Sequence, residues 1–172
     1  MPKYIKINVE DHRLIDNGRV CEDVTEVVIP DLEHPTTAIE NISGLAGNLE
    51  LPNPSKFNAA EFSINHNNGI NCEYLCDPET HNVEFRTVRQ KYNAAGAVIG
   101  HESVKYRLRG AHKSTGGETI NIGNPIGNTE RYSALRYEKI VDGKQVLLVD
   151  WLANKVIYNG VDHSTDISKF LV

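Results

Sequence analysis

The segment from Glu130 to Asp162 places the strongest constraint on the fold. It contains two Asx-Gly pairs, Asp142-Gly143 and Asn159-Gly160, flanked by residues rich in Val, Ile, Leu and Tyr. Both central positions of a type I′ turn need positive φ, so such pairs are strong hairpin signals. The pattern therefore predicts an antiparallel β unit. We expect its strands over Arg131–Val141, Lys144–Trp151 and Lys155–Tyr158.

The length of 172 residues fits one domain, residues 1–172, with a core that needs no disulfide or metal. No apolar run approaches the roughly 18–20 residues of a membrane span, and the N-terminus lacks the apolar segment of a signal peptide. We therefore expect cytoplasmic synthesis and no membrane anchor. The three cysteines, Cys21, Cys72 and Cys76, are an odd number with poor zinc spacing, and we expect reduced thiols.

The rest of the chain alternates between strand signals and loops. Asn17-Gly18 predicts a first hairpin, and Ile70–Cys76 has near-helical spacing that ends at Asp77-Pro78. A second short helix is expected to begin at Ser164 or Thr165, and the apolar C-terminus Phe170–Val172 is expected to be docked. Further strands are predicted over Val24–Ile29, Thr36–Ile42, Ala59–His66, Val83–Tyr92 and Val98–Gly110, and long loops over Ser43–Ser55 and Ala111–Asn128. The predicted fold class is mostly β: a single-domain antiparallel β-sandwich or half-barrel with one short helix and long loops.

No motif for catalysis or metal binding is present. The sequence has no Gly-x-Ser-x-Gly elbow, no phosphate-binding Gly-x4-Gly-Lys-Ser/Thr loop, no His-Glu-x-x-His and no EF-hand loop. His101-Glu102-Ser103 and His163-Ser164 cannot work locally, because adjacent residues on a strand point to opposite faces. We therefore expect no enzyme activity, no metal and no cofactor.

The run Tyr137–Val146, then Asp150, then Asn159–Asp162, resembles the C-terminal part of the major tail tube proteins of contractile-tailed phages. This is the FII-type family, to which the tubes of R-type pyocins are related. The first hairpin and Arg109-Gly110 also match the family pattern. The chain departs from it at Ile120–Gly127, where the family has a mixed-charge stretch, so contacts made by those charges in relatives cannot be transferred.

The resemblance implies a structural subunit of the inner tail tube. Its sheets would join around a hexameric ring into one continuous β-barrel, and the rings would stack into a tube for envelope penetration and DNA passage. The implied partners are further copies of the chain, a sheath protein, a tape-measure protein, and baseplate and tail-terminator proteins. DNA would pass through the bore without specific binding. The implied location is the virion, after synthesis in the host bacterial cytoplasm.

Two groups of residues are candidates for assembly contacts. The Ser43–Ser55 loop holds apolar side chains between glycines and prolines, which favours burial against a partner, and the family has a loop here that reaches the neighbouring ring. The family helix at Ile70–Cys76 lies on the outside of the ring, so nearby acidic residues are candidates for sheath contact. The stacking candidates are Gly44, Leu45, Ala46, Gly47, Leu49 and Leu51, and the sheath candidates are Glu73, Asp77 and Glu79.

The charge pattern also bears on nucleic acids. The net charge of −5 argues against a surface that grips a phosphate backbone, and an acidic bore would repel DNA. Lys105, Arg107 and Arg109 share one face of a predicted strand without interleaved exposed aromatics, which favours a solvated or subunit-pairing face.

Three other functions are compatible with this sequence. An effector-carrying tube of a type VI secretion or extracellular contractile injection system shares the fold and differs in cargo. A small β-sandwich ligand-binding module would be a monomer with a concave aromatic patch. A hydrolase would need an active site assembled from distant residues.

Overall fold

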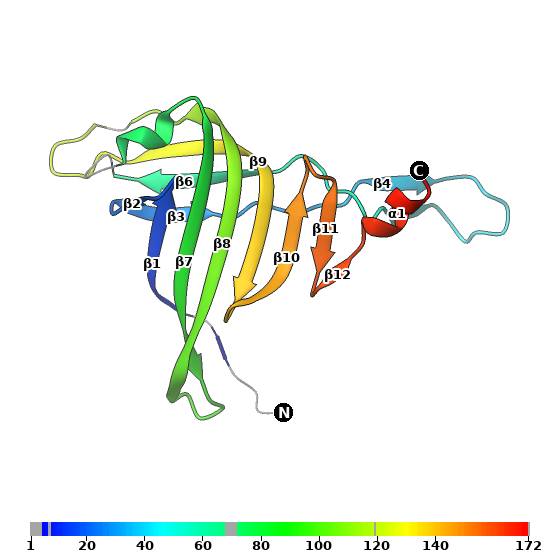
Figure 1. Cartoon of the computed structure of the whole chain (residues 1–172), viewed down its shortest axis with the longest axis horizontal. Coiled ribbons are helices and arrows are strands. Elements are labelled where there is room, and N and C mark those ends of the chain that lie inside the picture. Colours follow the sequence, from blue (N-terminus) through cyan, green and yellow to red (C-terminus); the bar gives the residue numbers. More distant parts are fainter. Residues whose placement is uncertain (1–4, 7, 68–71, 119, 172) are drawn as a thin grey trace.

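Strand β9 (Asn128–Val141) is shared by the two layers of the fold. Residues 5–6, 8–67, 72–118 and 120–171 are described by this computed structural model. The first half of β9 pairs with β6 (Glu61–His66), and its second half pairs with β10 (Lys144–Asp150). On its other side, β9 pairs with β8 (Val98–Thr115) along most of its length. Because β9 changes partner after Ser133, β6 and β10 run into different layers (Figure 1).

The described strands form one antiparallel ten-stranded sheet and a separate two-stranded sheet. The main path runs through β12 (Val161–Asp162), β11 (Lys155–Tyr158), β10, β9, β8, β7 (Thr80–Tyr92), β1 (Val9–Asp16) and β2 (Arg19–Cys21). β6 branches from β9 and also pairs with β3 (Val24–Val28). The small sheet consists of β4 (Thr36–Ile39) and β5 (Leu49–Pro52). The predicted mostly β, antiparallel fold is confirmed.

The core fills the space between the long strands and the β3–β6 layer. Phe62 and Ile64 enter it from β6, and Tyr132 from β9, all almost fully buried. Val104, Tyr106 and Leu108 are buried on β8, as their alternation with charged residues predicts. A 3₁₀ helix, η1 (Glu73–Cys76), adds the fully buried Leu75. Burial of this single core stabilises the domain.

The predicted turns are confirmed. Asp142 and Gly143 have φ values of 47° and 79°, and Asn159 and Gly160 have 48° and 84°. The first hairpin turns at Asn17-Gly18 in the same way, with φ of 46° and 83°. These values suit the type I′ turns that fix the register of each hairpin.

Two predicted loops and one predicted helix were wrong in their extent. The second half of the Ser43–Ser55 loop is strand β5, which pairs with β4 in a hairpin. Strand β8 runs to Thr115, five residues into the predicted loop over Ala111–Asn128. The predicted helix over Ile70–Cys76 is a single 3₁₀ turn from Glu73, and Ile70 lies outside the described residues. Strand β5 was not predicted because prolines lie close to its two leucines. Proline is unfavourable in the interior of a sheet and is tolerated on an edge strand.

The C-terminal helix was predicted correctly, whereas the state of the cysteines was not. Helix α1 (Thr165–Lys169) begins where it was predicted. Phe170 and Leu171 are exposed on this chain, so their predicted docking stays a prediction, and Val172 lies outside the described residues. Cys21 and Cys72 form a disulfide, so the expectation of three reduced thiols was wrong, and Cys76 is the free one. Within the described residues, no helix has the length and apolarity needed to cross a membrane.

Gly110 lies where β8 and β9 bend together. The register between them shifts at Arg109/Gly110, and the Phe62 ring stacks on Tyr132 there with centroids 4.9 Å apart. A Cβ on residue 110 would lie 2.5 Å from Cε1 of Phe62 and 3.0 Å from Cβ of Tyr132. Only glycine fits, because both neighbours are held in a close-packed core.

We predict that Gly110→Ala destabilises the protein by about 1–3 kcal/mol, since the added methyl group overpacks this site. Urea unfolding followed by circular dichroism measures the change. Gly117→Ala is the control, because a Cβ there meets nothing within 4 Å. Equal stability of the two variants would show that the Phe62 contact does not restrict residue 110.

Candidate assembly surfaces

The β4–β5 hairpin and its tip, residues 36–52, form an arm that projects from the rest of the molecule (Figure 1). Ile39 lies opposite Leu49, and Thr37 lies opposite Leu51, so the two leucines share one face of the hairpin. Leu45 at the tip, Leu49 and Leu51 are 45%, 44% and 47% exposed. The arm therefore brings the predicted stacking residues Gly44, Leu45, Ala46, Gly47, Leu49 and Leu51 together, all of them exposed.

The base of the arm is held by a cluster of aromatic residues that the sequence analysis missed. His34 stacks on Phe57 with ring centroids 4.3 Å apart, and Phe57 lies 6.2 Å from the Tyr158 ring and 6.5 Å from the Trp151 ring. The Trp151 indole N–H donates to the Asn58 carbonyl at 3.2 Å. Contacts of this kind fix the arm to β10 and β11 while the tip stays free. The scattered sequence positions of these rings gave no local signal.

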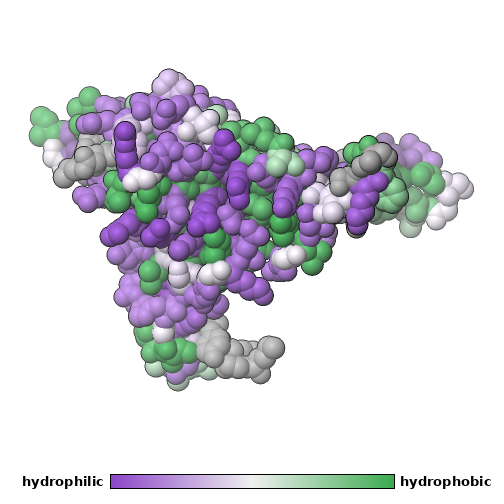
Figure 2. Space-filling view, viewed as in Figure 1, coloured by the Kyte–Doolittle hydropathy of each residue, from purple (hydrophilic) through white to green (hydrophobic). Residues whose placement is uncertain are grey.

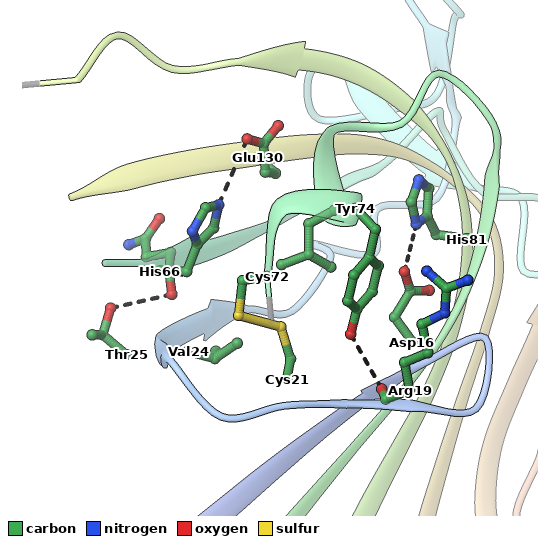
Figure 3. Close-up of a disulfide and its surroundings, with 12 residues drawn as sticks. Asp16, Arg19, Cys21, Val24, Thr25, His66, Cys72, Tyr74, His81 and Glu130 are labelled. Atoms are coloured by element: carbon green, nitrogen blue, oxygen red, sulfur yellow. Dashed lines mark hydrogen bonds and ion pairs between the residues drawn. A yellow bond between two sulfur atoms is a disulfide. The ribbon is translucent and has the colours of Figure 1, made fainter. Parts of the chain in front are cut away.

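The predicted sheath residues lie on or just after η1. Glu73 is in the helix, and Asp77 and Glu79 follow it, all three exposed. Contacts with the core and with β2 hold this short segment in place. The Tyr132 hydroxyl donates to the Leu75 carbonyl at 2.5 Å. The Cys21–Cys72 disulfide joins the residue before η1 to β2 (Figure 3). The Tyr74 hydroxyl also donates to the Arg19 carbonyl at 3.3 Å. The acidic side chains thus project from a segment that these contacts hold in place.

A buried ion pair holds the end of this segment. The His81 and Asp16 side chains are fully buried, with His81 Nδ1 2.7 Å from Asp16 Oδ2 (Figure 3). The other ring nitrogen, Nε2, lies 2.9 Å from the Asp77 carbonyl oxygen. A carbonyl and a carboxylate only accept hydrogen bonds, so the geometry suits a doubly protonated ring. Burial opposes the charged ring, but these two acceptors outweigh it and raise the pKa of His81.

This pair makes stability depend on pH. The ordinary histidine value is 6.5 and the folded pKa of His81 is higher, so the folded state holds the extra proton between the two values. Stability from protonation of His81 is complete below about pH 6.5 and is lost as pH rises through the folded pKa of His81, while burial separately raises the pKa of Asp16. We predict that the free energy of unfolding falls across this window, and that His81→Gln removes the fall. Urea titrations at several pH values measure it. His163→Gln is the exposed control, and an unchanged slope in His81→Gln would contradict this assignment.

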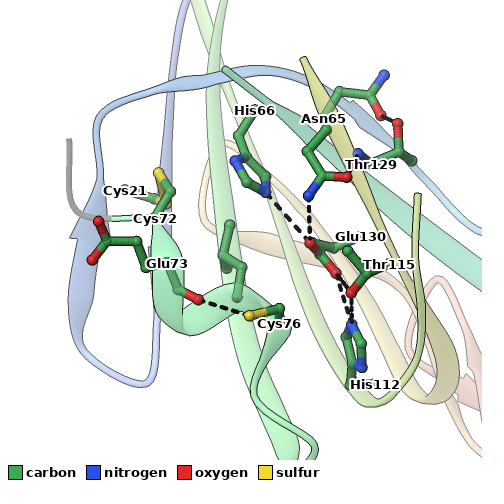
Figure 4. Close-up of polar contacts among 12 residues, drawn as sticks. Cys21, Asn65, His66, Cys72, Glu73, Cys76, His112, Thr115, Thr129 and Glu130 are labelled. Atoms are coloured by element: carbon green, nitrogen blue, oxygen red, sulfur yellow. Dashed lines mark hydrogen bonds and ion pairs between the residues drawn. A yellow bond between two sulfur atoms is a disulfide. The ribbon is translucent and has the colours of Figure 1, made fainter. Parts of the chain in front are cut away.

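A second buried polar cluster surrounds Glu130, which is 1% exposed (Figure 4). His112 Nε2 lies 2.7 Å from Glu130 Oε2, and the Thr115 hydroxyl donates to the same oxygen at 2.7 Å. His66 Nε2 lies 3.6 Å from Glu130 Oε1. The cluster links β6, β8 and β9 where the sheet turns over, and it satisfies a carboxylate that would otherwise be costly to bury.

The Asp16–His81 pair and Glu130 are closed off from solvent, and no serine or cysteine lies within the hydrogen bonds described for either. Among the described residues, no group of three or more His, Cys, Asp and Glu side chains is arranged to hold a metal ion. His101 is exposed and Glu102 is buried, so they point to opposite faces as predicted.

The sheet ends in strands that have a free edge. β2 ends one side of the main path, β12 ends the other, and β3 pairs only with β6 among the described strands. Free N–H and C=O groups at such edges are templates for pairing with another chain. The arm with its exposed leucines, the exposed acidic residues near η1 and the strands with free edges are surfaces that the described chain offers for contact with other chains.

Comparison with known proteins places this subunit. The sequence pattern of the family "Phage tail tube protein FII" matches residues 11–171, and the chain belongs to this family. The fold is similar to that of a chain in the sheath-tube complex of an extracellular contractile injection system, PVC, in the extended state, with 11% identity and a TM-score of 0.54. That match covers 77% of this chain and 90% of the other.

A chain in the PVC sheath/tube terminator, also in the extended state, is similar in fold with the same identity and TM-score. This match covers 77% of the present chain and 95% of the other. No protein with a curated description matches the sequence.

Proposed function

We propose that this chain is the repeating subunit of the inner tube of a contractile tail, in which hexameric rings stack around a tape-measure protein. Two observations together support this proposal: the sheet has strands with free edges, and the chain belongs to the tail tube family. Edge-to-edge pairing around a ring removes every free edge and joins the sheets into one barrel. The subunit then acts by geometry and charge and has no catalytic role.

The arm is proposed to connect one ring to the next. Its exposed leucines are costly in water and become favourable when a neighbouring subunit covers them. The aromatic base keeps the arm extended, so less entropy is lost when it docks. Glu73, Asp77 and Glu79 are proposed to contact a basic element of the sheath, because these acidic residues lie on or next to a segment that a disulfide holds in place.

In a phage, the tube would be part of the virion and would assemble from subunits made in the host bacterial cytoplasm. Baseplate and terminator proteins would cap its two ends, and the tube would pierce the envelope and pass DNA. The fold likeness to the PVC tube chains supports a second candidate, the tube of an extracellular injection system. Purified particles distinguish them, since nuclease-protected DNA is expected only in a phage.

We predict that Leu45→Asp/Leu49→Asp gives a folded protein that forms rings but no stacked tubes, because two carboxylates cannot be buried at the ring interface without partners. Negative-stain electron microscopy and circular dichroism measure the two properties. Leu45→Met/Leu49→Met is the matched control, since it keeps apolar side chains of similar volume and is expected to stack. Normal tubes in the Asp variant would refute the role of the arm.

A further inference from the structure

The Cys21–Cys72 disulfide joins two core positions that lie 51 residues apart in the chain. Cys21 is the last residue of β2, and Cys72 directly precedes η1. Both side chains are buried in the same core as Leu75, with exposed fractions of 4% and 1%. A reduced cysteine packs in a core as a small apolar side chain. The two positions therefore suit this fold in either oxidation state.

Other contacts hold η1 against the core without the disulfide. The Tyr132 hydroxyl on β9 donates to the Leu75 carbonyl at 2.5 Å. On β7, His81 Nε2 lies 2.9 Å from the carbonyl oxygen of Asp77, the residue that follows η1. Neither contact involves β2. We therefore expect the chain to reach this fold with both cysteines as thiols, which then lie side by side.

The η1 segment has little apolar burial of its own. It consists of four residues, of which only Leu75 is buried. The Leu75 N–H donates to the Cys72 carbonyl at 3.1 Å, and the Asp77 N–H donates to the Tyr74 carbonyl at 3.2 Å. Hydrophilic residues cover most of the surface around η1 in Figure 2. Segments with few buried apolar contacts open locally at a small cost in free energy. A covalent link at the start of η1 opposes such opening.

Cys76 does not belong to this pair. It is the last residue of η1, and its exposed thiol donates to the Glu73 carbonyl at 3.0 Å. Figure 4 shows Cys76 on the opposite side of η1 from the disulfide. Positions four residues apart in a 3₁₀ helix differ by roughly 120° around its axis. The Cys76 thiol therefore cannot exchange with the Cys72 sulfur while η1 is intact.

We propose that Cys21 and Cys72 form a redox lock on the η1 segment. The chain folds with both residues as thiols, and oxidation by a small-molecule disulfide closes the link and suppresses local opening of η1. A compartment that keeps thiols reduced leaves the lock open, and an oxidising one closes it. The lock controls the order of the segment that carries the exposed Glu73 and Asp77. The inference is independent of the proposed tube, because it concerns one chain.

The closing reaction is thiol–disulfide exchange. When η1 opens, the thiolate of one cysteine attacks a sulfur of oxidised glutathione and displaces one glutathione thiolate. The thiolate of the second cysteine then attacks the protein sulfur of this mixed disulfide and displaces the other glutathione thiolate. The two cysteines lose two protons and two electrons, and the glutathione disulfide is reduced to two thiols. Burial of both sulfurs then limits the access of reductants to the closed link.

The test compares backbone hydrogen exchange in the reduced and the oxidised full chain, measured by NMR. The amides of Leu75 and Asp77 are the reporters, because their hydrogen bonds break when η1 opens. Oxidation by glutathione disulfide is expected to slow their exchange at least about tenfold. The reference is the Asn53 amide, which donates to the Pro35 carbonyl at 2.8 Å in the distant arm and is expected to be unaffected (Figure 1).

Two variants isolate the effect of the link. Cys21→Ala/Cys72→Ala keeps apolar side chains at both positions and is expected to show no response to oxidation. Cys76→Ala is the matched control, since it removes only the exposed thiol and is expected to keep the full response. Mass spectrometry after alkylation is expected to find Cys21 joined to Cys72 and Cys76 alkylated in the oxidised chain.

The inference would be overturned by a reduced chain that does not fold, by an oxidised chain that lacks the Cys21–Cys72 link, or by equal exchange of the reporter amides in both forms. If the double alanine variant does not fold, the two forms of the unmodified chain still decide between these outcomes. Electron microscopy of both forms separates the two proposals. Absence of rings and tubes in both forms contradicts only the proposed function, whereas equal exchange contradicts only the lock.

Discussion

The whole fold depends on the change of partner along β9. Its first half pairs with β6 and its second half with β10, and β8 follows both halves on the other side. Two layers therefore form from one continuous sheet, with Phe62 and Tyr132 packed at the turn against the backbone of Gly110. Without this close approach, the core between the layers would open, because a side chain at residue 110 occupies the place of the Phe62 ring.

The same bend gives the two faces of the long strands different surroundings. One face of the long strands is covered by β3, β6 and η1, and the other remains open, with Lys105, Arg107 and Arg109 of β8 pointing outward. Buried polar contacts, above all Asp16–His81 and Glu130 with its histidines, hold the covering elements in place. The arm extends beyond both layers, and the ring contacts and the hydrogen bond described here hold it at its base. Each surface is thus held in place by a different set of contacts.

Local signals explain what the sequence predicted well. Asx-Gly turns set positive φ at fixed points, and period-2 alternation marked Val104, Tyr106 and Leu108 as buried, so most strands were predicted close to their true bounds. Two of the failures arise from pairing with another segment of the chain. Strand β5 exists because β4 supplies its hydrogen-bond partners, and Cys21 meets Cys72 only after the chain has folded.

The candidate surfaces follow the same division. The arm residues and the acidic residues near η1 were identified from local composition and a family resemblance, and the structure shows that they are exposed. Phe57 and Trp151 were missed because their contact joins distant segments. The sequence likewise did not show which charged residues lie beside Lys105, Arg107 and Arg109 in the sheet, because these come from β7 and β9.

The most direct test of the central claim is negative-stain electron microscopy of the purified protein at high concentration, with its mass measured in solution. The account predicts rings or hollow tubes of uniform width, with masses that are multiples of a six-subunit ring of this 19.2 kDa chain. A strict monomer at every concentration, even when preformed tube ends or a baseplate are supplied to initiate assembly, would contradict it.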